Sequence, residues 1–94
     1  MYGTVARLHI KPGMESKFME LGRAQQSANI PGYVASYVYQ MDGDPSEFYL
    51  TVVFTSKEAY LENAGSPEQH ARFQELMSVM AAEPEWHDGE IVSQ

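Results

Sequence analysis

The chain contains no cysteine among its 94 residues. That absence excludes disulfides, thiolate nucleophiles, iron–sulfur clusters and cysteine-ligated zinc sites. The sequence also has no apolar run near the roughly 18 residues that a membrane-spanning helix needs. Its first residues, MYGTVARLHIKPG, lack the basic start and apolar centre of a signal peptide. We therefore expect no membrane partner and a cytoplasmic location.

Positive charge is scarce as well. Six Lys and Arg residues face 13 Asp and Glu residues, for a net charge of -7, and the six are scattered along the chain. Because nucleic-acid binding requires a basic stripe that displaces counterions, we exclude nucleic acid as a partner. The length predicts a single domain over residues 1–94. A chain of this size buries only about 60–65% of its unfolded surface, so a partner subunit would add stability.

Hydrophobic periodicity and helix caps predict seven elements in the order strand, helix, strand, strand, helix, helix, strand. The first strand should start at Tyr2, and Thr55 and Ser66 should cap the second and third helices. The expected ranges are 2–10, 14–28, the hairpin 33–54 with a positive-φ glycine at Gly43, 55–63, 66–83 and 86–92. This order is the split βαβ, or ferredoxin-like, pattern. It predicts an α+β fold with an antiparallel sheet and helices on one face.

The predicted hairpin, YVASYVYQMDGDPSEFYLTVVF, is apolar or aromatic on both of its alternating faces. One face should meet the helices. Its expected members are Ala6, Leu8, Ile10, Val34, Val38, Phe48, Leu50, Val52 and Phe54. The opposite face should carry Val5, Arg7, His9, Tyr33, Tyr37, Tyr39, Tyr49 and Val53.

The four tyrosines of that opposite face would expose about 600–800 Å², more than the ~300–600 Å² patch of a typical monomer. A two-fold axis lets one such surface cover itself. We therefore predict a homodimer with an interface formed by Arg7, His9, Tyr33, Tyr37, Tyr39 and Tyr49. Two alternatives stay open: a tyrosine-rich face that water wets at its phenols, and a role for Arg7 and His9 in lining a pocket between subunits.

Four segments, HIKPGMESKF, IPGYVASYVY, YLTVVFTSKEAY and SPEQHARFQELM, together resemble the antibiotic biosynthesis monooxygenase (ABM) domain over nearly the whole chain. The resemblance implies a dimeric α/β barrel, in which two ferredoxin-like sheets pack face to face. Activities in that family include oxidation of phenols and quinols by O₂ without metal or flavin, haem breakdown and isomerisation of small molecules. Some members have no demonstrated activity.

The resemblance argues against haem as a cofactor. Haem-degrading relatives carry an Asn on the first strand, a Trp, and a His near the later helix. The matching first-strand and helix positions here hold Ala6 and Phe73, and Phe54 stands where many members have Trp. No motif matches the monooxygenases closely enough to carry over a catalytic residue.

His70 is the candidate general base, because an imidazole titrates near neutral pH and can take a proton from a phenol. It lies on the apolar stripe of the third helix, where a structural histidine is the alternative. Ser36 could donate to a substrate oxygen or bond to backbone, and Trp86 could wall a pocket or close the core. The expected substrate-binding residues are Phe18, Ser36, Phe54, Phe73, Met77 and Trp86.

The three histidines lack H-x-x-x-H or H-x-H spacing, so the sequence predicts no metal site. The hypothesis is a cofactor-independent monooxygenase that acts on a small phenolic or quinol-type compound, with O₂ as co-substrate. Two alternatives remain: a non-catalytic dimer that binds a small hydrophobic metabolite, and an isomerase or lyase that uses the same histidine.

Overall fold

A computed structural model describes residues 1–94, apart from the side chain of Ser27. It contains four strands and three helices: β1 (Tyr2–His9), α1 (Glu15–Ser27), β2 (Tyr33–Gln40), β3 (Glu47–Phe54), α2 (Lys57–Ala64), α3 (Pro67–Met77) and β4 (Glu85–Glu90). The strands form one antiparallel sheet in the order β2-β3-β1-β4. The α+β, ferredoxin-like prediction is confirmed. None of the described helices is long and apolar enough to cross a membrane.

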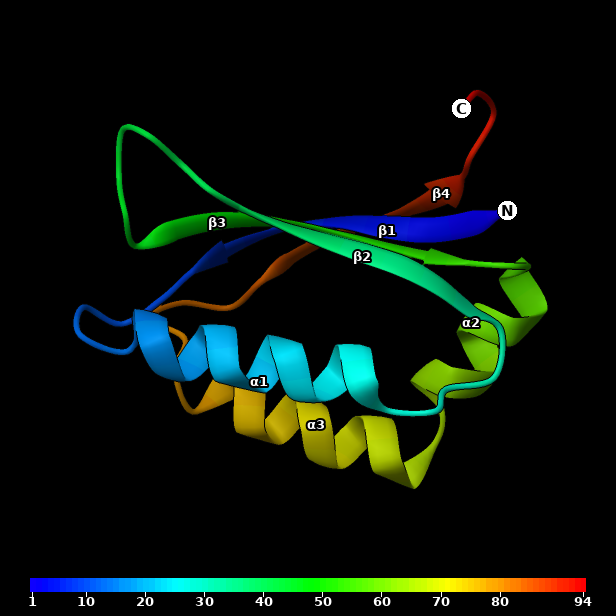
Figure 1. Cartoon of the computed structure of the whole chain (residues 1–94), viewed down its shortest axis with the longest axis horizontal. Coiled ribbons are helices and arrows are strands. Elements are labelled where there is room, and N and C mark those ends of the chain that lie inside the picture. Colours follow the sequence, from blue (N-terminus) through cyan, green and yellow to red (C-terminus); the bar gives the residue numbers. More distant parts are fainter.

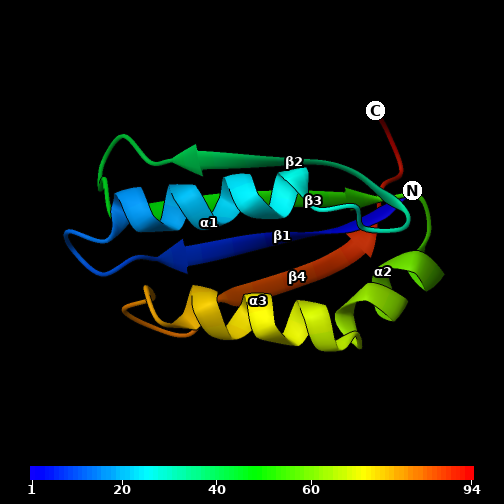
Figure 2. The same ribbon diagram turned by 60° about the horizontal axis from the view of Figure 1, so that its bottom comes forward.

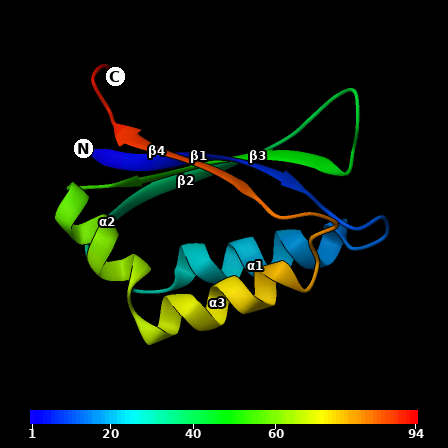
Figure 3. The same cartoon turned by 180° about the vertical axis from the view of Figure 1, so that it is seen from behind.

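All three helices lie on the same side of the sheet (Figures 1 and 3). Helix α1 runs over the half that contains β2 and β3, and α3 runs beside β4 (Figure 2). Strand alternation turns Ala6, Leu8 and Phe48 toward the helices, where they are buried. The ring centroid of Phe18 from α1 lies 4.8 Å from that of Phe48. Burying a side chain of this size contributes about 1.5–3 kcal/mol, so this contact anchors the start of α1.

Strand β2 begins with a bulge that changes which side chains face the helices. Tyr33 pairs with Phe54 and Ala35 pairs with Val53, which leaves Val34 as an extra residue. An extra residue shifts the in–out alternation of a strand by one position. The Tyr33 ring therefore lies on the helix side, 6.0 Å from the Phe54 ring, and Val34 is 45% exposed. The predictions that Tyr33 lies on the dimer face and Val34 on the helix face are wrong for this reason.

The cap of α2 lies one residue later than predicted. Ser56, not Thr55, is the N-cap, and its Oγ accepts a hydrogen bond from the backbone N–H of Ala59 at 3.1 Å. The cap of α3 is confirmed, since Ser66 Oγ accepts from the backbone N–H of Gln69 at 3.1 Å. Each cap satisfies a backbone donor that the helix itself leaves free.

The third helix ends earlier than the apolar stripe suggests. It stops at Met77 because the chain then turns to bring Met80 beside Ile10 in an isolated bridge, which buries Val79 and Met80. Strand β4 is also shifted and spans Glu85–Glu90 rather than 86–92.

The hairpin turn needs no positive φ at Gly43, since Gly13 and Gly32 are the described residues that have one. The turn is closed instead by Asp44, whose Oδ1 accepts from the backbone N–H of Ser46 at 2.9 Å.

We predict that Gly3→Ala lowers the free energy of unfolding by about 2 kcal/mol, as measured by chemical denaturation. Gly3 lies in β1, and a Cβ there would overlap the carbonyl oxygen of Val52. Gly89, its partner on β4, provides the matched control because a Cβ at Gly89 would meet nothing within 4 Å. Gly89→Ala should change stability by less than about 0.5 kcal/mol. Equal effects of the two substitutions would contradict the close approach of β1 and β3.

Candidate functional site

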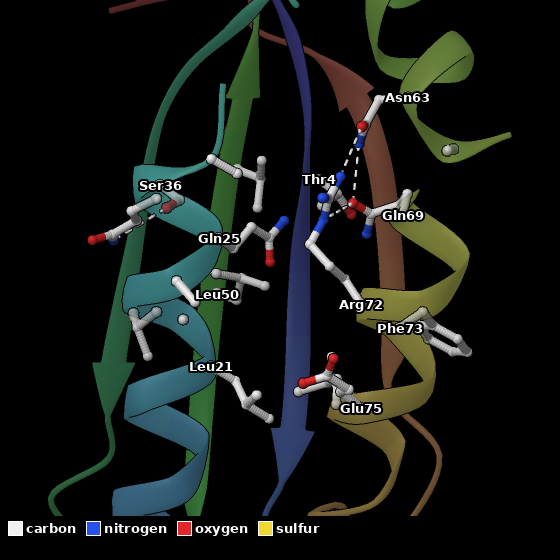
Figure 4. Close-up of a pocket in the computed structure, with 18 of the residues that line it drawn as sticks. Thr4, Leu21, Gln25, Ser36, Leu50, Asn63, Gln69, Arg72, Phe73 and Glu75 are labelled. Atoms are coloured by element: carbon white, nitrogen blue, oxygen red, sulfur yellow. Dashed lines mark hydrogen bonds between the residues drawn. The ribbon is translucent and has the colours of Figure 1, made fainter. Parts of the chain in front are cut away.

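A cavity of about 550 Å³ lies between α1, α3 and the helix-facing side of the sheet (Figure 4). This volume falls within the range of about 300–1,000 Å³ that small-molecule sites occupy. Leu21, Leu50 and Leu76 give it apolar walls. Gly22 also lines it, and a Cβ at Gly22 would meet nothing within 4 Å. This glycine in the middle of α1 therefore leaves space that a larger side chain would fill.

The structure brings together most of the residues that the sequence suggested for a pocket. The cavity is lined by His70 and by Phe18, Ser36, Phe54, Phe73 and Trp86. The ring of Phe73, on α3, lies beside the ring of Trp86, on β4, with the two centroids 6.3 Å apart. Met77 lies elsewhere and packs against the core that surrounds Phe18. Met77 is thus no part of the cavity wall.

His70 is at the rim of the cavity and is exposed to solvent. Its Nε2 lies 3.3 Å from the side-chain nitrogen of Gln74, one turn further along α3. An amide nitrogen only donates, so a hydrogen bond along this contact occupies the Nε2 lone pair. A base role for His70 therefore requires the Gln74 amide to move away from Nε2.

One end of the cavity carries a hydrogen-bonded group on α2 and α3. Arg72 Nε donates to Gln69 Oε1 at 3.2 Å, and Arg72 Nη2 donates to Asn63 Oδ1 at 3.5 Å. The amide of Asn63 donates to the same Gln69 oxygen at 3.2 Å. Figure 4 shows the Arg72 side chain extending from α3 into the space between the helices, toward Thr4. Two neutral side chains thus hold a guanidinium in the cavity wall.

Next to this group lie Thr4, Tyr60 and Asp88, which also line the cavity. The Tyr60 hydroxyl donates to Asp88 Oδ1 at 2.9 Å. Burial and this bond to a carboxylate together raise the pKa of Tyr60 to about 12. A side-chain hydrogen bond from the Thr4 hydroxyl to Tyr60 opposes that rise in the pKa of Tyr60. Thr4 Oγ1 is buried and has no partner of ordinary hydrogen-bond geometry among the described residues, so this contact to Tyr60 is a weak one.

A second polar group occupies the opposite wall, where α1 faces β2. The Tyr33 and Ser36 hydroxyls are 2.7 Å apart, and Gln26 Nε2 donates to Ser36 Oγ at 3.3 Å. The bulge in β2 is what turns Tyr33 toward Ser36. Ser36 therefore bonds to side chains rather than only to backbone, and a ligand oxygen at this wall would meet a neutral hydroxyl.

The sheet face that carries no helix, here called the open face, bears the charged residues predicted for the dimer interface. Arg7 Nε is 3.3 Å from Glu47 Oε1, and Arg7 Nη1 is 3.5 Å from Glu85 Oε2. The bond and charge of Glu47 raise the pKa of Arg7. The ligand atoms of His9, Asp44 and Glu47 lie within 4.8 Å of one another. Arg7 already balances the charge of Glu47, so this grouping does not favour a cation.

The polar end of the cavity was missed in the sequence because only apolar positions were used to find the inner face of the third helix. The residues of α3 that line the cavity include Gln69, Arg72, Phe73 and Leu76. Their spacing of i, i+3, i+4 and i+7 is the signature of one helical face. Two of the four are polar, which made this face look like a solvated one.

The Tyr60–Asp88 bond leads to a prediction on phenol titration. Because the folded-state pKa of Tyr60 is raised to about 12, its contribution to stability is complete below pH ~10, the unfolded value, and is lost as pH rises through the folded value. Asp88→Asn removes the carboxylate, which is one of the two main causes of the raised pKa of Tyr60, so Tyr60 should ionise at lower pH. Ultraviolet difference titration of wild type, Asp88→Asn and Tyr60→Phe would isolate this phenol. An unchanged titration in Asp88→Asn would contradict the role of the carboxylate.

Comparison with solved structures identifies the fold. SnoaB, described as a cofactor-independent oxygenase from Streptomyces nogalater, superposes with a TM-score of 0.86 at 15% identity, over 99% of this chain and 94% of that one. A candidate antibiotic biosynthesis monooxygenase from Nitrosomonas europaea gives a TM-score of 0.80 at 19% identity, over 99% and 100% of the two chains. A candidate antibiotic biosynthesis monooxygenase from Chloroflexus aurantiacus gives a TM-score of 0.81 at 22% identity, over 99% of this chain and 94% of that one.

At these identities the structural likeness establishes the fold alone. A comparison with curated proteins finds no match. The family model described as antibiotic biosynthesis monooxygenase, however, matches residues 1–76, which include every element from β1 to nearly the end of α3. On that match, the chain belongs to the antibiotic biosynthesis monooxygenase family.

Proposed function

We propose that the protein is a monooxygenase that oxidises a small phenolic or quinol-type compound with O₂, without metal or flavin. The observation that carries this proposal is the cavity, which combines aromatic walls with a histidine at its rim and polar groups at two ends. Family membership supports the reaction class. The description of SnoaB as a cofactor-independent oxygenase supports the lack of a cofactor.

The reaction needs no outside reductant. A phenol with a C–H para to its oxygen reacts with one O₂ to give a quinone and one water. The phenolic proton and the ring hydrogen leave as that water together with one oxygen atom, and the other oxygen atom becomes the new carbonyl. The substrate supplies all the electrons, so the protein has to remove a proton, stabilise the resulting anion and exclude water.

His70 is the proposed base for the first of these steps. The ring belongs to the cavity lining, and its Nε2 becomes available to a substrate proton when the Gln74 amide moves away. Phe18, Phe54, Phe73 and Trp86 are the proposed substrate walls, and Ser36 is a proposed hydrogen-bond partner. Apolar walls lower the local dielectric, which strengthens each charge–charge and hydrogen-bond contact made inside.

We further propose that two copies of the chain pack open face to open face as a dimeric α/β barrel, with one cavity in each subunit. Val5, Tyr37 and Tyr39 are 48%, 59% and 54% exposed on or beside this face. Arg7 forms ion pairs with Glu47 and Glu85 of the same chain. If a second copy covers this face, each of these charges therefore keeps an oppositely charged neighbour. A second copy would cover the aromatic surface that the helices leave bare.

The activity is tested by O₂ uptake with a panel of quinols and anthrones. We expect ¹⁸O₂ to place one labelled atom in the product, and His70→Ala to lower kcat at least about 100-fold, the usual range for loss of a general base. Glu68→Gln changes an exposed residue of the same helix and should leave the rate unaltered. No uptake with any compound would reject the oxygenase, and full activity in His70→Ala would reject the base.

The dimer is tested by native mass spectrometry. The wild type should have twice the 10.6 kDa mass of the chain. Val5→Glu places a carboxylate in the open face and should give a folded 10.6 kDa monomer. Leu61→Glu, at a 53% exposed position on α2, is the control and should stay dimeric. A monomeric wild type at micromolar concentration would reject the proposal.

A further inference from the structure

Gly22 occupies the middle of α1 without either of the usual structural reasons for a glycine in a helix. Its φ is not positive, since the described residues with a positive φ are Gly13 and Gly32. No neighbour excludes a side chain either, because a Cβ at Gly22 would meet nothing within 4 Å. Glycine nevertheless destabilises a helix interior relative to alanine. Natural proteins accept such a loss chiefly where function requires it.

The sheet beneath Gly22 is left uncovered. Phe18 of α1 packs on Phe48 of β3, and the helix and the strand run in the same direction from this contact (Figure 2). Four helical residues advance about 6 Å and two strand residues about 6.6 Å, so Gly22 comes to lie above Leu50. Leu50 belongs to an inner strand and yet is half-buried, whereas Phe48 and Val52 on either side of it are 2% and 8% exposed. The space between Gly22 and Leu50, both of which line the cavity, is here called the slot.

Gln25 lies on the same inner face of α1 as Gly22. Phe18, Leu21, Gly22 and Gln25 have the i, i+3, i+4, i+7 spacing of one helical face, and all four line the cavity. Figure 4 shows the half-buried Gln25 side chain extending from α1 into the space between the helices. Among the described residues its side-chain amide has no hydrogen-bond partner, whereas the amide of Gln26 bonds to β2. The Gln25 amide can therefore donate to a ligand or accept from it.

The wall that contains the slot is uncharged. The cavity-lining residues with ionisable acidic or basic side chains belong to α3 and β4, whereas those of α1, β2 and β3 are neutral. They are His70, Arg72, Glu75 and Asp88. A neutral part of a ligand is therefore favoured beneath α1, and its reacting end is favoured on the side of α3.

We propose that Gly22 and Gln25 are the residues that determine which ligands the cavity accepts. A second, fused ring of the ligand lies in the slot between the α1 backbone at Gly22 and the side chain of Leu50. The Gln25 amide bonds to a neutral hydroxyl or carbonyl group on that ring system. A ligand with one ring leaves the slot empty and forgoes these van der Waals contacts. This inference rests on the proposed function for the aromatic character of the ligand, and it adds the residues that set the size and orientation of that ligand.

The size limit is tested by calorimetric titration without O₂, with 2-naphthol as a two-ring probe and 4-methylphenol as a one-ring probe. In Gly22→Leu a side chain fills the slot, so 2-naphthol should bind about 10–100-fold more weakly, while 4-methylphenol stays within about threefold of wild type. Arg23→Leu places the same side chain on the exposed face of α1, outside the cavity lining, and should keep both affinities. An equal loss of both probes in Gly22→Leu, or no loss of 2-naphthol, would overturn the role of Gly22.

Gly22→Ala separates a role in ligand binding from a role in folding. Alanine favours the helix and meets no neighbour, so the Tm of the ligand-free protein should rise by about 5 °C. The same methyl group narrows the slot, so 2-naphthol should bind about threefold to tenfold more weakly. A fall in Tm would show that the glycine serves the packing of the fold, which contradicts the proposal.

Gln25→Met removes the amide at nearly constant side-chain length. It should weaken 2-naphthol binding about threefold to tenfold, the usual range for one hydrogen bond, and leave the affinity for naphthalene unchanged. An equal loss of both probes would reject the hydrogen bond to Gln25. Because O₂ is absent, these titrations do not depend on turnover. Size selection by Gly22 without O₂ uptake rejects the oxygenase and keeps the slot, whereas O₂ uptake that Gly22→Leu does not alter rejects the slot and keeps the oxygenase.

Discussion

The cavity depends on how α1 is held above the sheet. Phe18 packs on Phe48 near the start of the helix, and Ile30 packs with Phe54 just after its end. These contacts belong to two separate core clusters, and Leu50 touches both of them. Between them Gly22 carries no side chain, so the middle of α1 stands over open space. Protein interiors are normally close-packed, so an open space of this size is a specific feature of this fold.

Polar groups gather at the two ends of this space for different structural reasons. At one end, α2 and α3 meet and bring Asn63 beside Gln69 and Arg72. At the other, the bulge in β2 turns Tyr33 inward, where it reaches Ser36. An apolar cavity with polar ends selects ligands by orientation as well as by size, because a buried polar group left unpaired weakens binding.

In the proposed dimer, the two faces of the sheet therefore serve different purposes. Its helix-facing side supplies the floor of the cavity, while its open face presents aromatic side chains together with the paired Arg7, Glu47 and Glu85. The bulge removes Tyr33 from the open face, so the face is less aromatic than strict alternation would make it. It still exposes Tyr37 and Tyr39 by more than half, a surface suited to a second copy.

The sequence by itself determined the order of elements, most of the buried strand positions and the aromatic walls of the cavity, because these follow from local periodicity and caps. It could not show the β2 bulge or the early end of α3, since each is set by pairing with a distant segment: Phe54 and Val53 for the bulge, Ile10 for Met80. Nor could it show that Arg72 and Thr4 share one cavity. Those residues are 68 positions apart, and both line the cavity only because the helices cover β1.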